Sequence, residues 1–271
     1  MLKVGILGMG WLGSALAEHL MYMNFIQQSQ KKPLAYELIG TQRSIKKTPA
    51  GITTLLWEHP QNIPKDFYAD VVVLCTPASA LNDYDALRNS IQELYNIGTK
   101  KIIYTSSTGV YEGLSGEVKE ETELKETSDR QKHLMAVENI IASFENHVIL
   151  RLAGLVAEDR NPANFLSGKK NISGFNQAIN LVHKIDVVQI ITKLLQYNFT
   201  GIMNVVSDDH PQRKEFYEKL CDKFMLERPE FNGLELDSKI VSNTKSKEIL
   251  NYDYLIDDIE NYFLKLKVAK R

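Results

Sequence analysis

A short apolar run that passes directly into a glycine-rich turn constrains this chain more than any other feature. Lys3 to Leu7 predicts a strand, and a helix-forming run begins at Ser14. Between them lies the pattern G-x-G-x-x-G, formed by Gly8, Met9, Gly10, Trp11, Leu12 and Gly13. In that context the first glycine allows a sharp turn, the second lets the backbone approach a pyrophosphate, and the third lets helix and strand pack closely. The helix start offers N–H groups and a positive dipole end to phosphates. The sequence therefore predicts a dinucleotide-binding loop with contacts from Gly8, Gly10, Trp11, Leu12 and Gly13.

The end of the second predicted strand bears on which dinucleotide binds. A polar stretch from Asn24 to Pro33 predicts an exposed connection, and Leu34 to Ile39 predicts the strand. An acid after that strand would accept hydrogen bonds from the ribose 2′-OH of NAD, whereas an arginine suits the 2′-phosphate of NADP. No acid occurs between Gly40 and Pro49, a stretch that carries Arg43, Ser44, Lys46 and Lys47. We expect NADP, bound by Arg43 and Ser44, with NAD as the alternative if these basic residues only coat a solvated loop.

Further apolar runs alternate with helical periodicity, which indicates a Rossmann-type, doubly wound parallel α/β sheet. The buried central strand Ala69–Cys75 ends at Thr76 and Pro77, which we expect to meet the cofactor. We predict a dinucleotide-binding core over residues 1–155 and a small α/β C-terminal substrate lobe over 156–271, with 180–206 returning to the core. The remaining predicted strands are Thr53–Trp57, Lys101–Tyr104, Val148–Leu152 and Gly201–Val206.

Composition excludes several classes of partner. With 271 residues, 44% hydrophobic residues and a net charge of -2, the chain is typical of a globular protein with no electrostatic case for nucleic acid or an anionic membrane. No apolar run approaches the ~20 residues of a membrane span. Two cysteines without metal-ligand spacing, and a first strand close to Met1, predict a cytoplasmic protein without metal. We expect a monomer or a homodimer. Asp208, Asp209 and His210 are better explained as a turn before a helix than as metal ligands.

Four segments resemble, in order, those of extended short-chain dehydrogenase/reductases, specifically the NAD-dependent epimerase/dehydratase family. The resemblance spans nearly the whole chain, weakens after Lys214 and does not specify a substrate. It implies that Ser107 is the catalytic serine, that Ser106 lies near the cofactor, and that Gly154 and Leu155 lie by the nicotinamide. The segments are Gly8-x-Gly10-x-x-Gly13, Tyr104-Thr-Ser-Ser-Thr-Gly-Val-Tyr111, Arg151-Leu-Ala-Gly-Leu155 and Asn180-Leu-Val-His-Lys-Ile-Asp-Val-Val188.

One departure from that family is informative. Its members carry a catalytic Tyr-x-x-x-Lys on the next helix, yet Glu112 to Val148 contains no tyrosine, and the family positions fall on Arg130 and Leu134. The chain thus resembles atypical members that lack the pair. Arg130 stays protonated, so it can hold an anion but hardly exchange a proton. His133 is titratable but lies one position off the expected face.

Two functions from different classes follow. The first is an NAD(P)-dependent epimerase/dehydratase-like or reductase-like enzyme acting on a small molecule, with Ser107 polarising a substrate oxygen and Arg130 holding an anionic group. The second is a non-catalytic NADP(H)-binding sensor or interaction protein, which the missing pair favours. A hydroxyacid-dehydrogenase type would suit the run ending at Pro77, but the Ser106–Ser107 motif argues against it.

Overall fold

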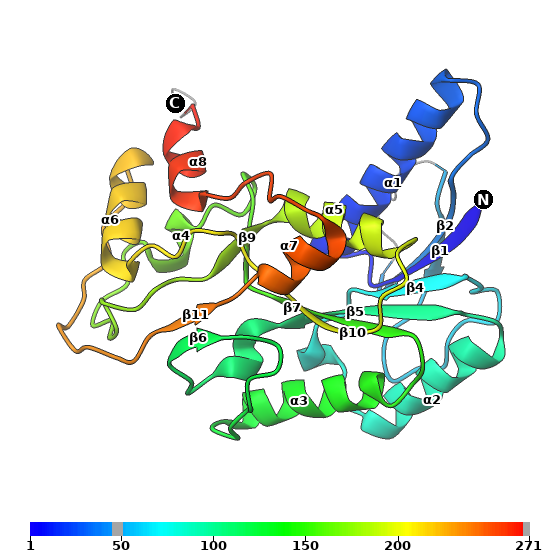
Figure 1. The fold of residues 1–271 in the computed structure, drawn as a ribbon, viewed down its shortest axis with the longest axis horizontal. Coiled ribbons are helices and arrows are strands. Elements are labelled where there is room, and N and C mark those ends of the chain that lie inside the picture. The colour runs from blue at the N-terminus through cyan, green and yellow to red at the C-terminus, as the bar shows by residue number, and fades with distance from the viewer. Residues whose placement is uncertain (45–50, 268–271) are drawn as a thin grey trace. The chain divides into compact units, whose positions relative to one another are not determined.

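A central sheet organises the chain in its computed structural model, which describes residues 1–44 and 51–267 (Figure 1). Over these residues the sheet has seven strands in the order β3-β2-β1-β4-β5-β7-β10. The pairs β1–β2, β1–β4, β2–β3 and β4–β5 are parallel. The predicted doubly wound α/β architecture is confirmed. The strands are β1 (Leu2–Leu7), β2 (Tyr36–Gln42), β3 (Thr53–Leu56), β4 (Val71–Leu74), β5 (Lys101–Ser107), β7 (His147–Leu152) and β10 (Gly201–Val205).

The strand order reverses direction beside β1. The chain leaves β1 through α1 (Trp11–Ser29) to reach β2 on one side, whereas β4 lies on the other side of β1. In Figure 1, α1 covers one face of the sheet, and α2 (Tyr84–Asn96) and α3 (Asp129–Ala142) lie side by side on the other. In an open parallel sheet, the point where the strand order reverses leaves a crevice at the carboxyl ends of the strands, and ligands bind there.

Helix α1 is longer than the sequence predicts. The expected exposed connection from Asn24 to Pro33 is wrong for its first part, because α1 continues to Ser29. Within the helix, the Asn24 side chain is engaged: its Nδ2 donates to the Tyr36 carbonyl (2.7 Å) and its Oδ1 accepts from the amides of Ala35 (3.0 Å) and Tyr36 (2.9 Å). The polar residue therefore fastens the start of β2 to the helix instead of ending the helix.

The chain divides into two compact units. The first unit comprises Met1–Ser107, Ser128–Arg151 and Val188–Met203, and the second comprises Thr108–Thr127, Leu152–Val187 and Asn204–Arg271. Lys46 and Lys47, expected near the cofactor, lie outside the described residues. No helix within residues 1–44 and 51–267 is long and apolar enough to cross a membrane.

The second unit contains two small parallel pairs, β6 with β11 and β8 with β9. Its core packs Val156, Leu166, Phe216 and Phe263 together at 9% exposure or less.

The remaining described elements, from both units, are η1 (Ala78–Ala80), η2 (Thr108–Tyr111), β6 (Gly116–Val118), β8 (Gly154–Val156), α4 (Ala163–Leu166), β9 (Leu181–His183), α5 (Lys184–Leu194), α6 (Arg213–Lys223), β11 (Lys239–Val241), α7 (Thr244–Leu250) and α8 (Ile259–Lys265).

Candidate functional site

The three glycines of the first loop differ in what the protein itself demands of them. Gly8 has φ +102°, a conformation that L side chains rarely adopt. A Cβ on Gly13 would lie 2.2 Å from the Gly8 carbonyl oxygen, so the close contact between helix and strand requires a glycine there. A Cβ on Gly10 would meet nothing within 4 Å. The fold therefore requires Gly8 and Gly13, whereas the space at Gly10 is open.

The loop is held to the neighbouring strand, and its Gly8, Met9 and Gly10 line a cavity, whereas the predicted contacts Trp11, Leu12 and Gly13 are not among the described residues of that lining. Met9 N donates to the Thr41 carbonyl (2.7 Å) and Gly8 N donates to Thr41 Oγ1 (3.1 Å). Gly10 is the N-cap of α1, and no side chain caps this helix end. Trp11 and Leu12 are the first residues of the helix, with Leu12 buried at 8% exposure. An uncapped helix N-terminus presents N–H donors, which is the geometry that binds an anion.

A cavity of about 740 Å³ opens at the carboxyl ends of β1, β2, β3 and β4, all within the first unit. This is the edge at which the sheet topology predicts a ligand. The described residues around it are Gly8, Met9, Gly10, Gln42, Arg43, Ser44, Trp57, Glu58, His59, Cys75, Thr76, Pro77, Ser79, Ala80 and Asn82. Six residues predicted from the sequence, namely Gly8, Gly10, Arg43, Ser44, Thr76 and Pro77, are thus brought together.

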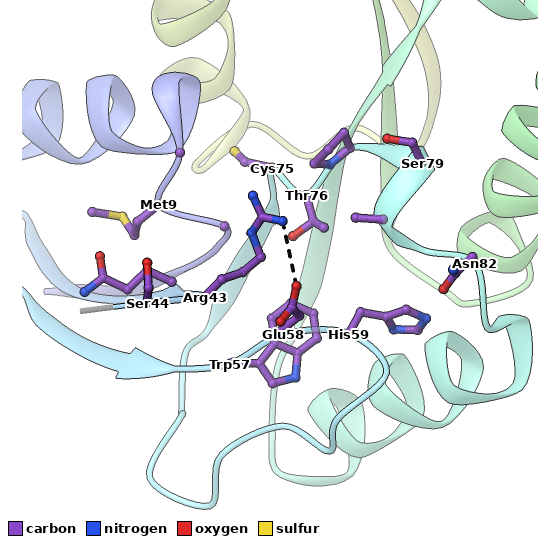
Figure 2. A pocket seen from close by; sticks show the side chains of 15 residues that line it. Met9, Arg43, Ser44, Trp57, Glu58, His59, Cys75, Thr76, Ser79 and Asn82 are labelled. Atoms are coloured by element: carbon purple, nitrogen blue, oxygen red, sulfur yellow. Dashed lines mark ion pairs between the residues drawn. The ribbon is translucent and has the colours of Figure 1, made fainter. Parts of the chain in front are cut away.

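The cavity holds an acid that sequence reasoning missed. Arg43, directly after β2, reaches toward Glu58, and the Arg43 Nη1 to Glu58 Oε1 distance is 3.7 Å (Figure 2). The side chains are 76% and 55% exposed, respectively. The acid that binds the ribose is expected after the second strand, whereas Glu58 follows the third. Because β2 and β3 are parallel neighbours, their carboxyl ends meet at one edge, and that adjacency is the signal that could have found it.

The end of β4 is tied to the end of β1. Cys75 N donates to the Leu7 carbonyl (2.9 Å), and Thr76 Oγ1 donates to the same oxygen (3.2 Å). Burial raises the pKa of the Cys75 thiol to about 12, so this cysteine stays protonated and is a poor nucleophile at neutral pH. Thr76 and Cys75 therefore shape the cavity floor.

His59 lies in the cavity wall with one ring nitrogen unmatched. Its side chain is buried, and Nε2 accepts from the Asp83 amide at 3.2 Å. Nδ1 is buried and has no hydrogen-bond partner among the described residues. Because Nε2 accepts, Nδ1 carries the proton in the neutral ring. Burial lowers the pKa of His59, and this outweighs the opposite effect of Asp83. His59 is thus a neutral donor beside the cavity.

The residues that the family resemblance implies beyond the glycine loop are not among the described residues that line this cavity. Ser107 is the last residue of β5 and is half-buried, whereas Ser106 is buried and its Oγ donates to Glu138 Oε1 at 2.6 Å. None of Ser106, Ser107 and Arg130 is among the described residues that line the cavity. Gly154 and Leu155 belong to β8 in the second unit.

Helix α3 places Arg130 and His133 differently. Arg130 is exposed in the first turn of the helix. His133 contacts Tyr84 Oη through Nδ1 (2.7 Å) and the Ala78 carbonyl through Nε2 (2.7 Å). A carbonyl only accepts, so Nε2 carries the proton and Nδ1 accepts from Tyr84. Both nitrogens are engaged, and His133 anchors η1, which contributes Ser79 and Ala80 to the cavity wall.

The described part of the chain contains no cluster of metal-ligating side chains. No group of three or more His, Cys, Asp or Glu side chains is arranged there to hold a metal ion. In the turn after β10, Asp208 accepts from Asn243 Nδ2 (2.6 Å) and Lys247 Nζ (2.8 Å). Burial would raise the pKa of Asp208, but these hydrogen bonds and the nearby charges of Lys247 and His210 together outweigh it, so the pKa is lowered.

Comparison with solved structures identifies the fold. A candidate NAD-dependent epimerase/dehydratase from Methylobacillus flagellatus superposes with a TM-score of 0.75 at 21% identity, over 95% of this chain and 94% of the other. UDP-glucuronic acid 4-epimerase from Bacillus cereus, solved with NAD, superposes with a TM-score of 0.73 at 16% identity, over 97% and 100%. The fold is that of the NAD-dependent epimerase/dehydratases, as the resemblance predicted.

A full-length relative identifies the narrower family. Protein YeeZ of Escherichia coli K12 is 32% identical over 277 residues, which cover 95% of this chain and 97% of YeeZ. The chain belongs to the family of YeeZ. No protein-family model matches it.

Proposed function

We propose that this chain binds NADP(H) in the cavity at the carboxyl edge of its sheet. The observation that carries the proposal is the contrast among the glycines: only Gly10 has open space where a Cβ would be, so the fold itself has no need of a glycine at that position. A pyrophosphate in close contact with the backbone supplies that need. The uncapped start of α1 would supply the N–H donors, and Thr76 and Pro77 would flank the ligand.

The preference for NADP over NAD rests on Arg43 and Ser44. Both follow β2 directly, where the ribose of a dinucleotide is recognised in this fold, and both line the cavity. A guanidinium forms paired hydrogen bonds with a phosphate, and a serine hydroxyl adds a further donor. The adenosine 2′-phosphate is the group of NADP that these side chains would bind.

We infer that the chain uses the cofactor on a small molecule in an epimerase/dehydratase-like or reductase-like reaction. When bound, the nicotinamide would accept or return a hydride. Ser107, at the end of β5, would donate a hydrogen bond to the substrate oxygen, and Arg130 would hold a carboxylate or phosphate of the substrate. The B. cereus neighbour acts on UDP-glucuronic acid, so anionic sugar nucleotides are the first substrates to test.

The alternative is a non-catalytic NADP(H)-binding sensor. It is favoured by the side chains on α3, where exposed Arg130 and buried Leu134 fall at the positions that the family resemblance assigns to the Tyr and Lys. Incubation with NADP and a panel of sugar nucleotides, followed by chromatography and by absorbance of the reduced nicotinamide, separates the two functions. Cofactor binding without conversion or reduction favours the sensor.

The cofactor site itself is tested with Gly10→Ala. We expect this variant to fold with a loss of no more than about 1 kcal/mol, because Gly10 is a helix N-cap with room for a methyl group. NADPH affinity should fall by at least about tenfold, measured by calorimetric titration. Gln212→Ala is the control, since Gln212 is also a helix N-cap, its side chain makes no capping hydrogen bond, and it lies in the second unit. Unchanged affinity in Gly10→Ala contradicts the site.

A further inference from the structure

The Arg43–Glu58 pair occupies the part of the cavity wall where a ribose substituent would be recognised. Arg43 comes from the end of β2 and Glu58 from the end of β3, and both line the cavity. Figure 2 shows the Arg43 side chain extended toward Glu58. Among the described residues that line the cavity, Glu58 is the one carboxylate. The cation expected to bind a phosphate therefore already has an anionic neighbour.

The geometry makes this neighbour exchangeable. A single nitrogen–oxygen distance of 3.7 Å between side chains that are 76% and 55% exposed is a loose ion pair, without the paired hydrogen bonds of a tight one. Arg43 has five N–H donors, so a phosphate can replace the carboxylate or share the guanidinium with it. If Glu58 stays nearby, its charge repels the phosphate; if it moves, the pair is lost. Either way, Glu58 opposes the binding of a 2′-phosphate.

The same carboxylate suits the unphosphorylated ribose. An acid at the ribose end of the crevice accepts hydrogen bonds from the 2′-OH of NAD. Glu58 supplies an acid at this edge although β2 itself ends without one. On the basis of the proposed cofactor site, we propose that Glu58 sets the selectivity between the two dinucleotides, as the counter-ion that a 2′-phosphate must displace from Arg43 and as the acceptor for a ribose hydroxyl. NADP preference in this chain is then limited by an acid from the neighbouring strand.

The test is Glu58→Gln, which keeps the size of the side chain and removes its charge. Titrations of the full chain with NADPH and NADH should show NADPH affinity rising severalfold and NADH affinity unchanged or lower. The ratio of the two dissociation constants should shift by about tenfold toward NADPH, the size expected for one unit charge at this distance in a partly solvated site. Circular dichroism checks that the variant folds, which its exposed position favours.

The matched control is Glu37→Gln. Glu37 is likewise half-exposed, at 49%, and pairs with Lys3 at 3.5 Å, but it lies near the start of β2, away from the carboxyl edge of the sheet. It loses the same charge and should leave the ratio unchanged. In an Arg43→Ala background, Glu58→Gln should shift the ratio much less, because its main target is gone.

Different results would contradict the proposed cofactor site and the proposed role of Glu58. If neither cofactor binds the unmodified chain, the proposed function itself fails. If both bind and Glu58→Gln leaves their ratio within twofold of the unmodified chain, or moves it toward NADH, the role of Glu58 is overturned. An equal shift in Glu37→Gln also overturns it, because the effect is then one of net charge.

Discussion

Two Arg–Glu pairs in the first unit have the same chemistry and opposite surroundings. Arg43 and Glu58, on the cavity wall, are 3.7 Å apart and mostly exposed. Glu138 on α3 and Arg151 on β7 are 2.8 Å apart, with side chains 5% and 4% exposed. Arg151 Nε adds further bonds to both Glu138 oxygens, and Ser106 Oγ donates to Oε1. One pair is open to exchange, and the other is part of the core.

The difference shows where a ligand can compete. A buried pair that loses one member leaves an uncompensated charge in a medium of low polarity, so its partners cannot be traded. An exposed pair is weak and screened, and a phosphate can take the place of its carboxylate. The buried pair joins β5, α3 and β7 beneath the Ser106–Ser107 end, and it therefore holds the strand that carries the predicted catalytic serine.

The largest expected effect comes from breaking the buried pair. Glu138→Ala should lower the free energy of unfolding by about 3–5 kcal/mol, because the buried Arg151 loses the carboxylate that balances its charge. Urea unfolding followed by circular dichroism measures this. The control is Glu121→Ala, which removes a carboxylate from an exposed pair with Lys245 and should cost less than about 1 kcal/mol. Equal losses in the two variants would contradict the contrast drawn between the pairs.

A smaller effect, on binding instead of stability, is expected at the exposed pair. Arg43→Ala should weaken NADPH binding by about 10- to 100-fold, the loss of a charge-assisted hydrogen-bond pair, and leave NADH affinity nearly unchanged. The free energy of unfolding should stay close to that of the unmodified chain, since Arg43 is 76% exposed. Arg88→Ala, on α2, removes another exposed arginine and serves as control. NADPH affinity that is the same in Arg43→Ala and in the unmodified chain would show that Arg43 does not bind the phosphate.

The exposed pair also marks where sequence reasoning succeeds and where it stops. The steric need for glycine at positions 8 and 13, and the place of Arg43 in the cavity lining, were predictable because they depend on local order: a strand, a turn, a helix start and a strand end. Glu58 depends on which strands are neighbours, and His59 on a backbone amide from Asp83, 24 residues away. Neither relation has a local signature.

The same limit explains the helix that was misjudged and the serine whose hydroxyl is engaged. Asn24, within α1, donates to the Tyr36 carbonyl, and the Ser106 hydroxyl donates to Glu138 on α3. Polar residues such as these predict a loop or a binding site when read singly. In the fold, they satisfy backbone or charged groups that lie far away in the sequence.

The smallest expected effect is a pH dependence of the free energy of unfolding that arises from His59 in the cavity wall. Burial lowers the pKa of His59 below its usual value, so between the lowered pKa and about 6.5 the unfolded chain binds more protons than the folded chain. The stability contributed by the neutral ring is therefore complete above about pH 6.5 and is lost as the pH falls. Urea unfolding at pH 7.5 and 5.5 should show a loss for the unmodified chain and a smaller loss for His59→Gln. His19→Gln provides the comparison, since burial also lowers the pKa of His19 and that residue lies on α1, outside the cavity lining.

Saturating NADPH tests whether His59 also donates to the cofactor. If it does, NADPH should enlarge the part of the acid-induced stability loss that His59→Gln removes, but not the part that His19→Gln removes, because a cofactor that binds the neutral ring opposes its protonation. The same change in both variants would place His59 in the fold alone and leave the binding of the cofactor to the glycine loop and the Arg43–Glu58 pair.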